Sequence, residues 1–280
     1  NYNPMYQVLS KDMIEFEIVP YLPKPKRGFK SKAPLYEIVN AILYKLKTVI
    51  QWEYMPVKSL FSKAFLHYKT VFGYYRKWCK REVWISCWIG LLKRYKSLLD
   101  LSSSDLDGSH TTALRGGQQV GYQGRKKRKT TNALYLTDRQ GLPIAMSKPV
   151  SGNHNDLFEI EVQFEEVIGT LEEAEICVDG LFVNADAGFD AQKLRNQCEA
   201  KGIIANICPN KRNGNTNVDH YFDKKLYKER YAIERTNAWM DSFRSLLNRF
   251  DTTITSWKGF NFLAFIVIGL KKFYKLKKSR

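Results

Sequence analysis

After residue 100 the sequence alternates short apolar segments with longer segments of helical periodicity, and this order narrows the range of possible folds. The segment 101–107 has the pattern of a strand that ends at a carboxylate. Residues 130–150 have the pattern of a β-hairpin around the turn Asp138-Arg-Gln-Gly141. Strands are also predicted at 181–186 and 203–208, and helices at 156–173, 190–201, 225–248 and 257–276. This mixed order predicts an α/β layer structure built on one mixed sheet.

The first 99 residues have a different pattern, in which helices predominate. Apolar residues at helical spacing predict helices at 34–47, 62–80 and 81–98, and three short helices with basic flanks are typical of a helix-turn-helix arrangement. This part carries 18 basic and 6 acidic side chains, a net +12 of the total of +17. We therefore expect a small all-α domain at 1–99 that binds a polyanion, followed by an α/β domain at 100–280.

The second of these predicted helices has one basic and one apolar side. The basic side carries Lys69, Gly73, Arg76 and Lys80, and the other faces carry Val71, Tyr74, Tyr75 and Trp78. A basic face about 16 Å long fits the phosphates that line a groove of duplex DNA. A solvated helix surface has the same pattern, so the face alone does not establish DNA binding.

The cysteines and the apolar segments bear on the cellular compartment. The five cysteines are scattered without a C-x-x-C pair, which favours buried thiols in a reducing compartment over a disulfide framework. The most apolar segment, 260–270, is 11 residues long, whereas a membrane span needs about 20. No signal peptide is visible. We expect a cytoplasmic, nucleoid-associated protein that does not enter a membrane, with a flexible basic tail at 271–280.

Three acidic residues have positions that are typical of a metal-dependent active site. Asp107 and Asp186 are each predicted at the end of a strand, and Glu234 lies in a predicted helix. Carboxylates placed in this way can converge on one point and bind divalent cations such as Mg²⁺. Two of the acids also have an ordinary interpretation, because Asp before Gly, as at Asp107, is common in turns and Glu234 is spaced to pair with Arg230.

The residues around these acids resemble the three acidic motifs of bacterial insertion-sequence transposases. The motifs are Asp107-Gly-Ser-His110, Ala185-Asp186-x-Gly-Phe-Asp190 and Tyr227-x-x-Arg230-x-x-x-Glu234-Arg235. The resemblance is to the DDE enzymes of the insertion sequence four and five superfamilies, and it is strongest to the insertion sequence five type. Further matching stretches run from about residue 17 to 272 and include Leu22-Pro23, Gln51-Trp52, Gly121-Tyr-Gln-Gly124, Thr137-Asp-x-x-Gly141-x-Pro143 and Gly152-Asn-His-Asn-Asp156.

This resemblance implies a fold, a reaction and a set of metal ligands. The α/β domain is then a ribonuclease H-like catalytic domain, in which Asp107, Asp186 and Glu234 are catalytic and bind two Mg²⁺ or Mn²⁺ ions. The enzyme is expected to cleave DNA at the transposon ends and to join the 3′-hydroxyl to target DNA. Its expected partners are double-stranded DNA, as terminal inverted repeats and target, and a second copy of the chain.

The resemblance and the charge pattern together predict the residues that contact DNA. In the family, a tyrosine and an arginine before the glutamate help to hold the transposon end, and here they are Tyr227 and Arg230. A lysine seven residues after the glutamate belongs to the broader signature, but this chain has Asp241 there, and Arg244 is the alternative contact. The predicted set also includes Arg235 next to Glu234, the basic loop with Arg125, Lys126 and Lys127, and the basic helix face with Lys69, Arg76 and Lys80.

Several neighbouring residues and two other functions stay open at this point. Asp105 is the alternative to Asp107 on the same strand face, and His110 either lies near the metals or caps local backbone. Asp190 is expected to cap the helix that follows, and Asp156 to start a helix. The alternative functions are a nuclease of the same fold without strand transfer and a non-catalytic DNA-binding protein.

Overall fold

The computed structural model describes residues 6–24, 31–63, 66–211 and 220–279. The chain divides into two compact units. One consists of residues 1–91 and 240–280, and the other of residues 92–239. The first unit therefore combines both ends of the chain, whereas the sequence pattern predicts 100–280 as one domain. Contacts alone do not show which part acts as a functional domain, so the division at residue 99 stays a prediction.

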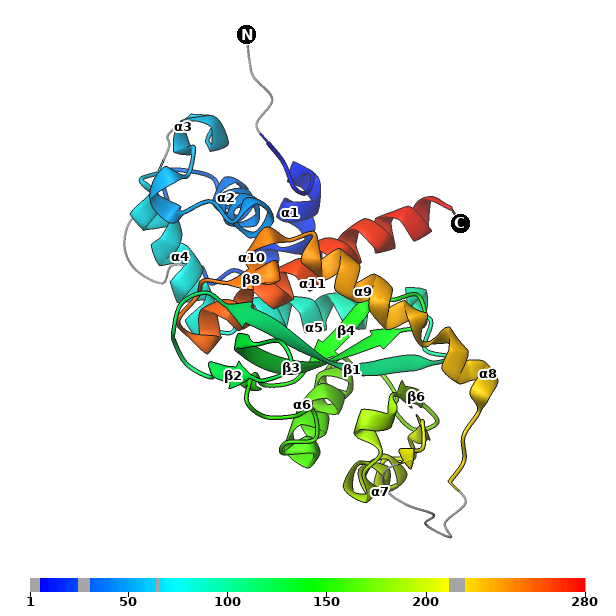
Figure 1. Cartoon of the computed structure of the whole chain (residues 1–280). Coiled ribbons are helices and arrows are strands. Elements are labelled where there is room, and N and C mark those ends of the chain that lie inside the picture. Colours follow the sequence, from blue (N-terminus) through cyan, green and yellow to red (C-terminus); the bar gives the residue numbers. More distant parts are fainter. Residues whose placement is uncertain (1–5, 25–30, 64–65, 212–219, 280) are drawn as a thin grey trace. The chain divides into compact units, whose positions relative to one another are not determined.

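The first unit is helical, as the sequence predicts (Figure 1). A buried aromatic cluster joins its two chain segments. Tyr75 stacks on Phe260 with 4.4 Å between ring centroids, and Trp88 meets Phe265 edge-on at 5.8 Å. Its elements are α1 (Lys11–Glu17), η1 (Val19–Tyr21), α2 (Leu35–Thr48), η2 (Trp52–Tyr54), α3 (Val57–Leu60), α4 (Tyr68–Lys80), most of α5 (Val83–Tyr95), α10 (Arg244–Leu247), β8 (Asn248–Arg249) and α11 (Ile254–Lys278).

Helix α4 has the two sides that the sequence predicts. Lys69, Arg76 and Lys80 are exposed, whereas Tyr75 and Trp78 are buried. The side chain of His67 caps the helix by accepting from the amide of Lys69 at 3.2 Å. The basic face is therefore available to a ligand, and the identity of that ligand as DNA stays a prediction.

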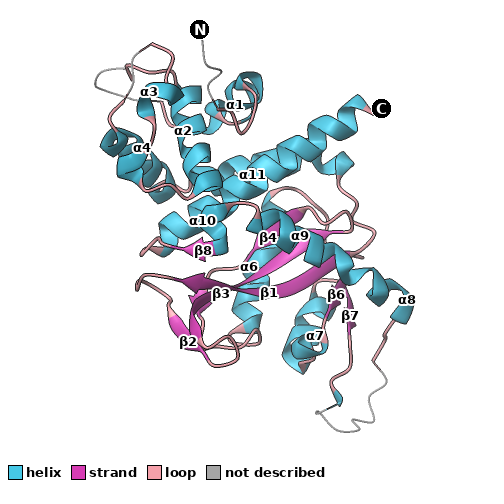
Figure 2. Ribbon diagram, turned by 45° about the horizontal axis from the view of Figure 1, so that its top comes forward, coloured by secondary structure: helices cyan, strands magenta, loops and turns pink. Residues whose placement is uncertain are grey.

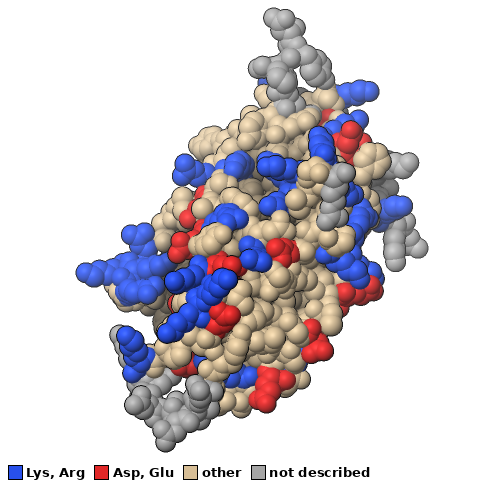
Figure 3. Space-filling view, turned by 90° about the vertical axis from the view of Figure 1, so that its right-hand side faces the viewer, with Lys and Arg blue, Asp and Glu red and all other residues tan. Residues whose placement is uncertain are grey.

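The excess of basic side chains in the chain as a whole is visible on the surface shown in Figure 3, where lysine and arginine cover more area than aspartate and glutamate.

The second unit is built on a mixed sheet (Figure 2). Strand β3 (Arg128–Asp138) pairs antiparallel with β1 (Ser104–Ala113) on one side and with β4 (Pro143–Met146) on the other. Beyond β1 the sheet continues in parallel through β6 (Phe182–Ala185) and β7 (Ile204–Ile207). The short strands β2 (Gly121–Gln123) and β5 (Val150–Ser151) also pair with β3. The resulting order β4-β3-β1-β6-β7, with β3 running against the rest, is the ribonuclease H-like arrangement.

Helices cover this sheet on both faces. Helices α6 (Ile160–Glu173) and α7 (Gln192–Ala200) lie together on one face, and α9 (Tyr231–Asp241) lies on the opposite one (Figure 1). Helix α6 buries Phe164, Val167 and Ile168, whose spacing gives one apolar side toward the sheet. The remaining short elements are η3 (Lys96–Leu98), η4 (Ala187–Phe189), α8 (Lys224–Tyr227) and η6 (Lys228–Arg230).

Three predicted elements differ from the structure. Strand β1 does not end at Asp107 but continues to Ala113, because its pairing with β3 runs on to Thr112. The long helix predicted at 225–248 is divided into α8, η6, α9 and α10. The tail from residue 271, expected to be flexible, is helical up to Lys278 as the end of α11.

Candidate active site

Two of the three predicted catalytic acids come from neighbouring parallel strands. In the register of β1 and β6, Asp105 faces Asn184 and Leu106 faces Ala185, so the next position sets Asp107 beside Asp186. Asp186 follows the last residue of β6 and caps η4, where its Oδ1 accepts from the amide of Gly188 at 2.7 Å. The parallel register thus places two carboxylates side by side, one within β1 and one just after the end of β6.

The environment of Asp107 opposes its ionisation. Burial raises the pKa of Asp107 to about 6, and the negative charges of Asp186 and Asp156 add to the increase. Arg230 lowers the same pKa, and so does the hydrogen bond that the amide of Gly108 donates to Asp107 Oδ1 at 3.0 Å. A partly buried carboxylate beside a second one is a common sign of a functional site, because such a pair gains most from a bound cation.

Tyr227 and Arg230 lie beside this pair. Arg230 acts electrostatically on both Asp105 and Asp107, and its guanidinium lies 5.9 Å from the ring centroid of Tyr227. Burial raises the pKa of Tyr227, Arg230 opposes the increase, and Asp186 contributes to it. Arg230 Nη1 is buried and has no hydrogen-bond partner among the described residues. The structure therefore brings the predicted tyrosine and arginine to the two strand acids.

Glu234 occupies a different environment. It lies in the first turn of α9 and its side chain is exposed. In the described ranges, no group of three or more His, Cys, Asp or Glu side chains lies close enough to hold one metal ion. The structure thus pairs Asp107 with Asp186 but does not add Glu234 to them. The assignment of Glu234 as a third ligand stays a prediction.

The turn between β3 and β4 holds the helix that carries Glu234. Thr236 Oγ1 donates to the carbonyl oxygen of Gly141 at 2.5 Å, and Arg235 Nη1 donates to that of Gln140 at 3.1 Å. Gly141 has φ +78°, and a Cβ there would lie 2.8 Å from the carbonyl oxygen of Ala232. Only glycine at position 141 therefore allows the turn to lie this close to the backbone of α9. Arg235, predicted to contact DNA, has this intramolecular partner, and its role in DNA binding stays a prediction.

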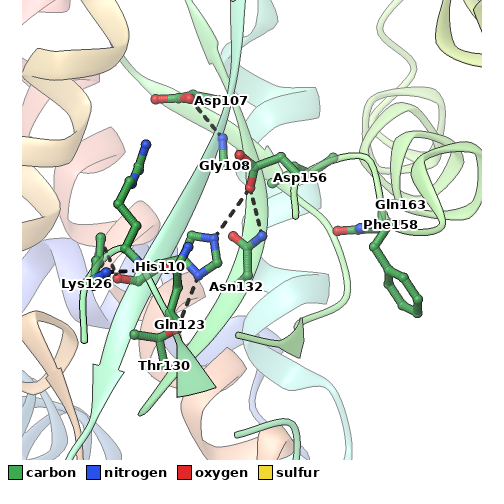
Figure 4. A network of polar contacts seen from close by, with 12 residues as sticks. Asp107, Gly108, His110, Gln123, Lys126, Thr130, Asn132, Asp156, Phe158 and Gln163 are labelled. Carbon is green, nitrogen blue, oxygen red and sulfur yellow. Dashed lines mark hydrogen bonds and ion pairs between the residues drawn. The ribbon is translucent and has the colours of Figure 1, made fainter. Parts of the chain in front are cut away.

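A second network lies on the other side of β1 from Asp107 (Figure 4). Asp156 Oδ1 accepts from Asn132 Nδ2 at 2.8 Å and lies 3.8 Å from His110 Nε2. His110 Nδ1 is 3.2 Å from Thr130 Oγ1, and burial lowers the pKa of His110. A Cβ on Gly108 would lie 2.1 Å from Asp156 Oδ1, so the glycine after Asp107 makes room for this carboxylate.

These contacts revise the expectations for three residues. Asp156 lies before the start of α6 at Ile160 and packs on β1 rather than starting the helix. Asp190 does not cap α7, whose N-cap is Ala191; it accepts instead from Arg195 at 2.7 Å and from the amide of Asn210 at 2.7 Å. His110 contacts side chains of β3 and the segment that follows β5, and it does not cap local backbone.

The remaining predicted DNA contacts lie on the surface. Arg125, Lys126 and Lys127 are exposed at the turn between β2 and β3. Gln123 Oε1 shapes this turn by accepting from the amides of Arg125 and Lys126. Lys126 Nζ donates to the carbonyl oxygen of His110 at 3.0 Å, which ties the basic turn to β1. Arg244 is exposed at the start of α10. Their contact with DNA stays a prediction.

The comparison with family models decides which group of proteins these motifs represent. Residues 16–88 match a family described as "Putative transposase of IS4/5 family", and residues 97–268 match the family described as "Transposase DDE domain". The second match spans more than half of the chain. The chain belongs to the DDE transposase family. The resemblance to transposases of the insertion sequence four and five type is thereby confirmed.

Other comparisons add little about this transposase. No curated protein matches the chain significantly. Among solved structures it is similar to "Crystal structure of the Mos1 mariner paired end complex with Mn", with 13% sequence identity, a TM-score of 0.27, and coverage of 86% of this chain and 79% of the other. A similarity this low carries no argument about function. In the described part of the transposase, no helix is both long enough and apolar enough to cross a membrane.

Proposed function

We propose that this transposase cuts DNA at the ends of its insertion sequence and joins the freed 3′-hydroxyl to target DNA. The observation that supports the proposal is the pairing of Asp107 with Asp186 beside Tyr227 and Arg230, in a chain of the DDE family. Water attacks the phosphorus at the transposon end and the 3′-oxygen leaves with a proton. That 3′-hydroxyl then attacks a phosphodiester of the target and displaces the target's own 3′-oxygen.

The two strand acids fit a divalent cation. They supply oxygen ligands, which Mg²⁺ and Mn²⁺ prefer, and a bound cation would offset the cost of burying the Asp107 carboxylate, which is the main cause of its raised pKa, and its repulsion with Asp186, which adds to it. We propose that Asp107 and Asp186 hold such ions and that Glu234 completes the set. When bound, the ions activate the attacking oxygen and stabilise the leaving oxygen.

The other residues of the site bind and orient the DNA. Nη1 of Arg230 is buried and has no hydrogen-bond partner among the described residues. It would donate a hydrogen bond to a phosphate oxygen bound beside the acids. Tyr227, with its ring next to that guanidinium, fits the sugar and phosphate of the same nucleotide. The basic turn at Arg125–Lys127 and the exposed face of α4 supply further phosphate contacts.

The test separates binding from cutting. Asp107→Ala, Asp186→Ala and Glu234→Ala are each expected to abolish cleavage and to leave binding of a labelled end largely unchanged, as measured by gel retardation. Asp179→Ala removes an exposed acid that also precedes a glycine, and it is expected to cleave like the parent chain. Full cleavage by one of the three variants would remove that residue from the site.

The products of the same reaction distinguish the alternatives. Joining of the cut end to a second duplex supports transposition, whereas cutting without joining indicates a nuclease. End binding without any cutting by the parent chain would indicate a non-catalytic DNA-binding protein. A chelator is expected to stop cleavage, and Mg²⁺ or Mn²⁺ to restore it.

A further inference from the structure

Three buried polar side chains form a row across neighbouring strands of the sheet. Asp105, Asn184 and Asn206 are direct partners in the registers of β1 with β6 and of β6 with β7. Asn184 Nδ2 donates to Asp105 Oδ1 at 3.0 Å, and Asn206 Nδ2 donates to Asn184 Oδ1 at 2.7 Å. Asp105 is 2% exposed and the two asparagines 0%. We call these three residues the polar row.

The polar row is costly for a sheet interior. Burying an amide costs free energy unless its hydrogen bonds are replaced, burying an ionised carboxylate costs more, and leucine at the same position has no such cost. Buried polar groups that are retained in this way often specify one arrangement of neighbouring elements rather than adding stability.

One end of the polar row holds the segment that leads to the predicted site residues. Asn206 Oδ1 accepts from the amide of Asp223 at 2.7 Å, and Asn206 Nδ2 also donates to the carbonyl oxygen of Asp223 at 3.1 Å. Asp223 in turn caps α8, because its Oδ1 accepts from the amides of Lys225 and Leu226 at 2.7 and 3.0 Å. Tyr227 is the last residue of α8, and Arg230 follows one turn later.

The other end of the polar row faces the same segment. Burial raises the pKa of Asp105 to about 6, and Arg230 and the backbone of Ile233, both on this segment, lower it. Asp105 also precedes Asp107 by two residues on the same face of β1. The polar row therefore connects the strand that carries Asp107 with the start of the segment that carries Tyr227, Arg230 and Glu234.

We propose that Asn184 and Asn206 are positioning residues, which set the α8–α9 segment relative to Asp107 and Asp186 through the backbone of Asp223. The proposal rests on the proposed DNA cleavage at these acids. An apolar side chain at position 206 removes both hydrogen bonds to Asp223, and one at position 184 removes the hydrogen bond that orients Asn206. Misplacing a reacting group by about 1 Å can lower a rate about 100-fold.

The experiment uses the full chain and the variants Asn206→Leu and Asn184→Leu. Gln163→Leu is the matched control, because Gln163 is also a buried amide of this unit, bonded to Ser147 Oγ at 2.9 Å, but on α6. Each variant is compared in end cleavage, end binding and thermal unfolding, and hydrogen exchange is followed at the amides of α8. Asn206→Ala serves as a second variant if the leucine does not fit.

The expected result is a loss of cleavage by about 100-fold in Asn206→Leu and Asn184→Leu. End binding and melting temperature are expected to stay close to the parent values, while the amides of α8 exchange faster. Gln163→Leu is expected to cleave normally. Normal cleavage by a folded Asn206→Leu would overturn the proposal, and so would a loss that only follows unfolding. If Asp107→Ala also cleaves, the proposed function itself has failed.

Discussion

The environment of Asp107 lowers the stability of the folded chain at neutral pH. The folded chain raises the pKa of Asp107 from 3.8 to about 6, mainly through burial. The folded state thus binds the proton more tightly than the unfolded state, so this group's contribution to stability is lost as the pH rises from about 4 to 6. At pH 7 the ionised carboxylate is therefore held in an unfavourable environment, which the proposed binding of a cation would relieve.

We predict that Asp107→Asn raises the melting temperature at pH 7 and abolishes cleavage. The amide keeps the shape of the side chain but has no charge to bury beside Asp186, so the destabilising term disappears. The increase in melting temperature is expected to shrink as the pH falls below about 6, where the carboxyl of the parent chain is protonated and also uncharged. Thermal unfolding in metal-free buffer at pH 5 and pH 7 measures both effects. A lower melting temperature at pH 7 would contradict this account.

The sequence identifies some of these residues and not others. Asp107, Asp186, Tyr227 and Arg230 lie in motifs with fixed spacing, and the structure does bring them together. Asn184 and Asn206 have no such signal, because an asparagine within an apolar strand does not reveal which strand it faces. Their pairing depends on the parallel register of β1, β6 and β7, which only the folded sheet defines.

The periodicity of apolar residues predicts the type and the order of the helices and strands better than the residues at which they begin and end. The hairpin, the strands after it and the helices α2, α5 and α11 are found close to where apolar spacing places them, whereas α4 begins later than predicted, at Tyr68, and α1 and α3 are not predicted. Asp107-Gly108-Ser109 has the composition of a turn, but β1 continues through it because Gly108 gives room to Asp156 instead. No glycine or proline lies between 225 and 248 to indicate the breaks in that helix. At one break Phe243 is buried in an extended conformation, a tertiary effect that local sequence does not show.

The turn that holds α9 gives a prediction at this scale. Gly141→Ala is expected to lower cleavage strongly, because its Cβ would lie 2.8 Å from the carbonyl oxygen of Ala232 and push α9 away. Gly180→Ala is the matched control, with φ +79° against +78° but no atom within 4 Å of its Cβ. Both variants have the left-handed strain of about 1 kcal/mol, which thermal unfolding measures. Equal cleavage by the two variants would show that the contact with α9 does not matter.

For the whole molecule, the division into units changes how DNA binding is to be tested. Helix α4 packs on α11 through Tyr75 and Phe260, so a fragment of residues 1–99 would lose part of its buried aromatic cluster. The sequence predicts the basic face of α4 from spacing alone, but it does not show that the other end of the chain completes the unit. The full chain is therefore the proper subject for binding measurements.

We predict that replacing Lys69, Arg76 and Lys80 together by alanine weakens binding to end DNA and flattens its salt dependence. Each phosphate contact contributes about 0.9 to the slope of log affinity against log salt, so three contacts account for nearly three units. The helix itself is expected to stay folded, because all three side chains are exposed and Tyr75 and Trp78 keep the buried side.

The control makes the same change in charge elsewhere. Lys11, Lys148 and Lys193 are also exposed, and they lie in α1, after β4 and in α7. Replacing these three by alanine removes the same charge from the chain but no proposed phosphate contact, so the slope is expected to change much less. Binding to a labelled end is measured from about 50 to 200 mM salt, a range over which several phosphate contacts change affinity by orders of magnitude. An unchanged slope in the α4 variant, or an equal decrease in both, would show that the basic face of α4 is solvated surface and that the DNA is held elsewhere.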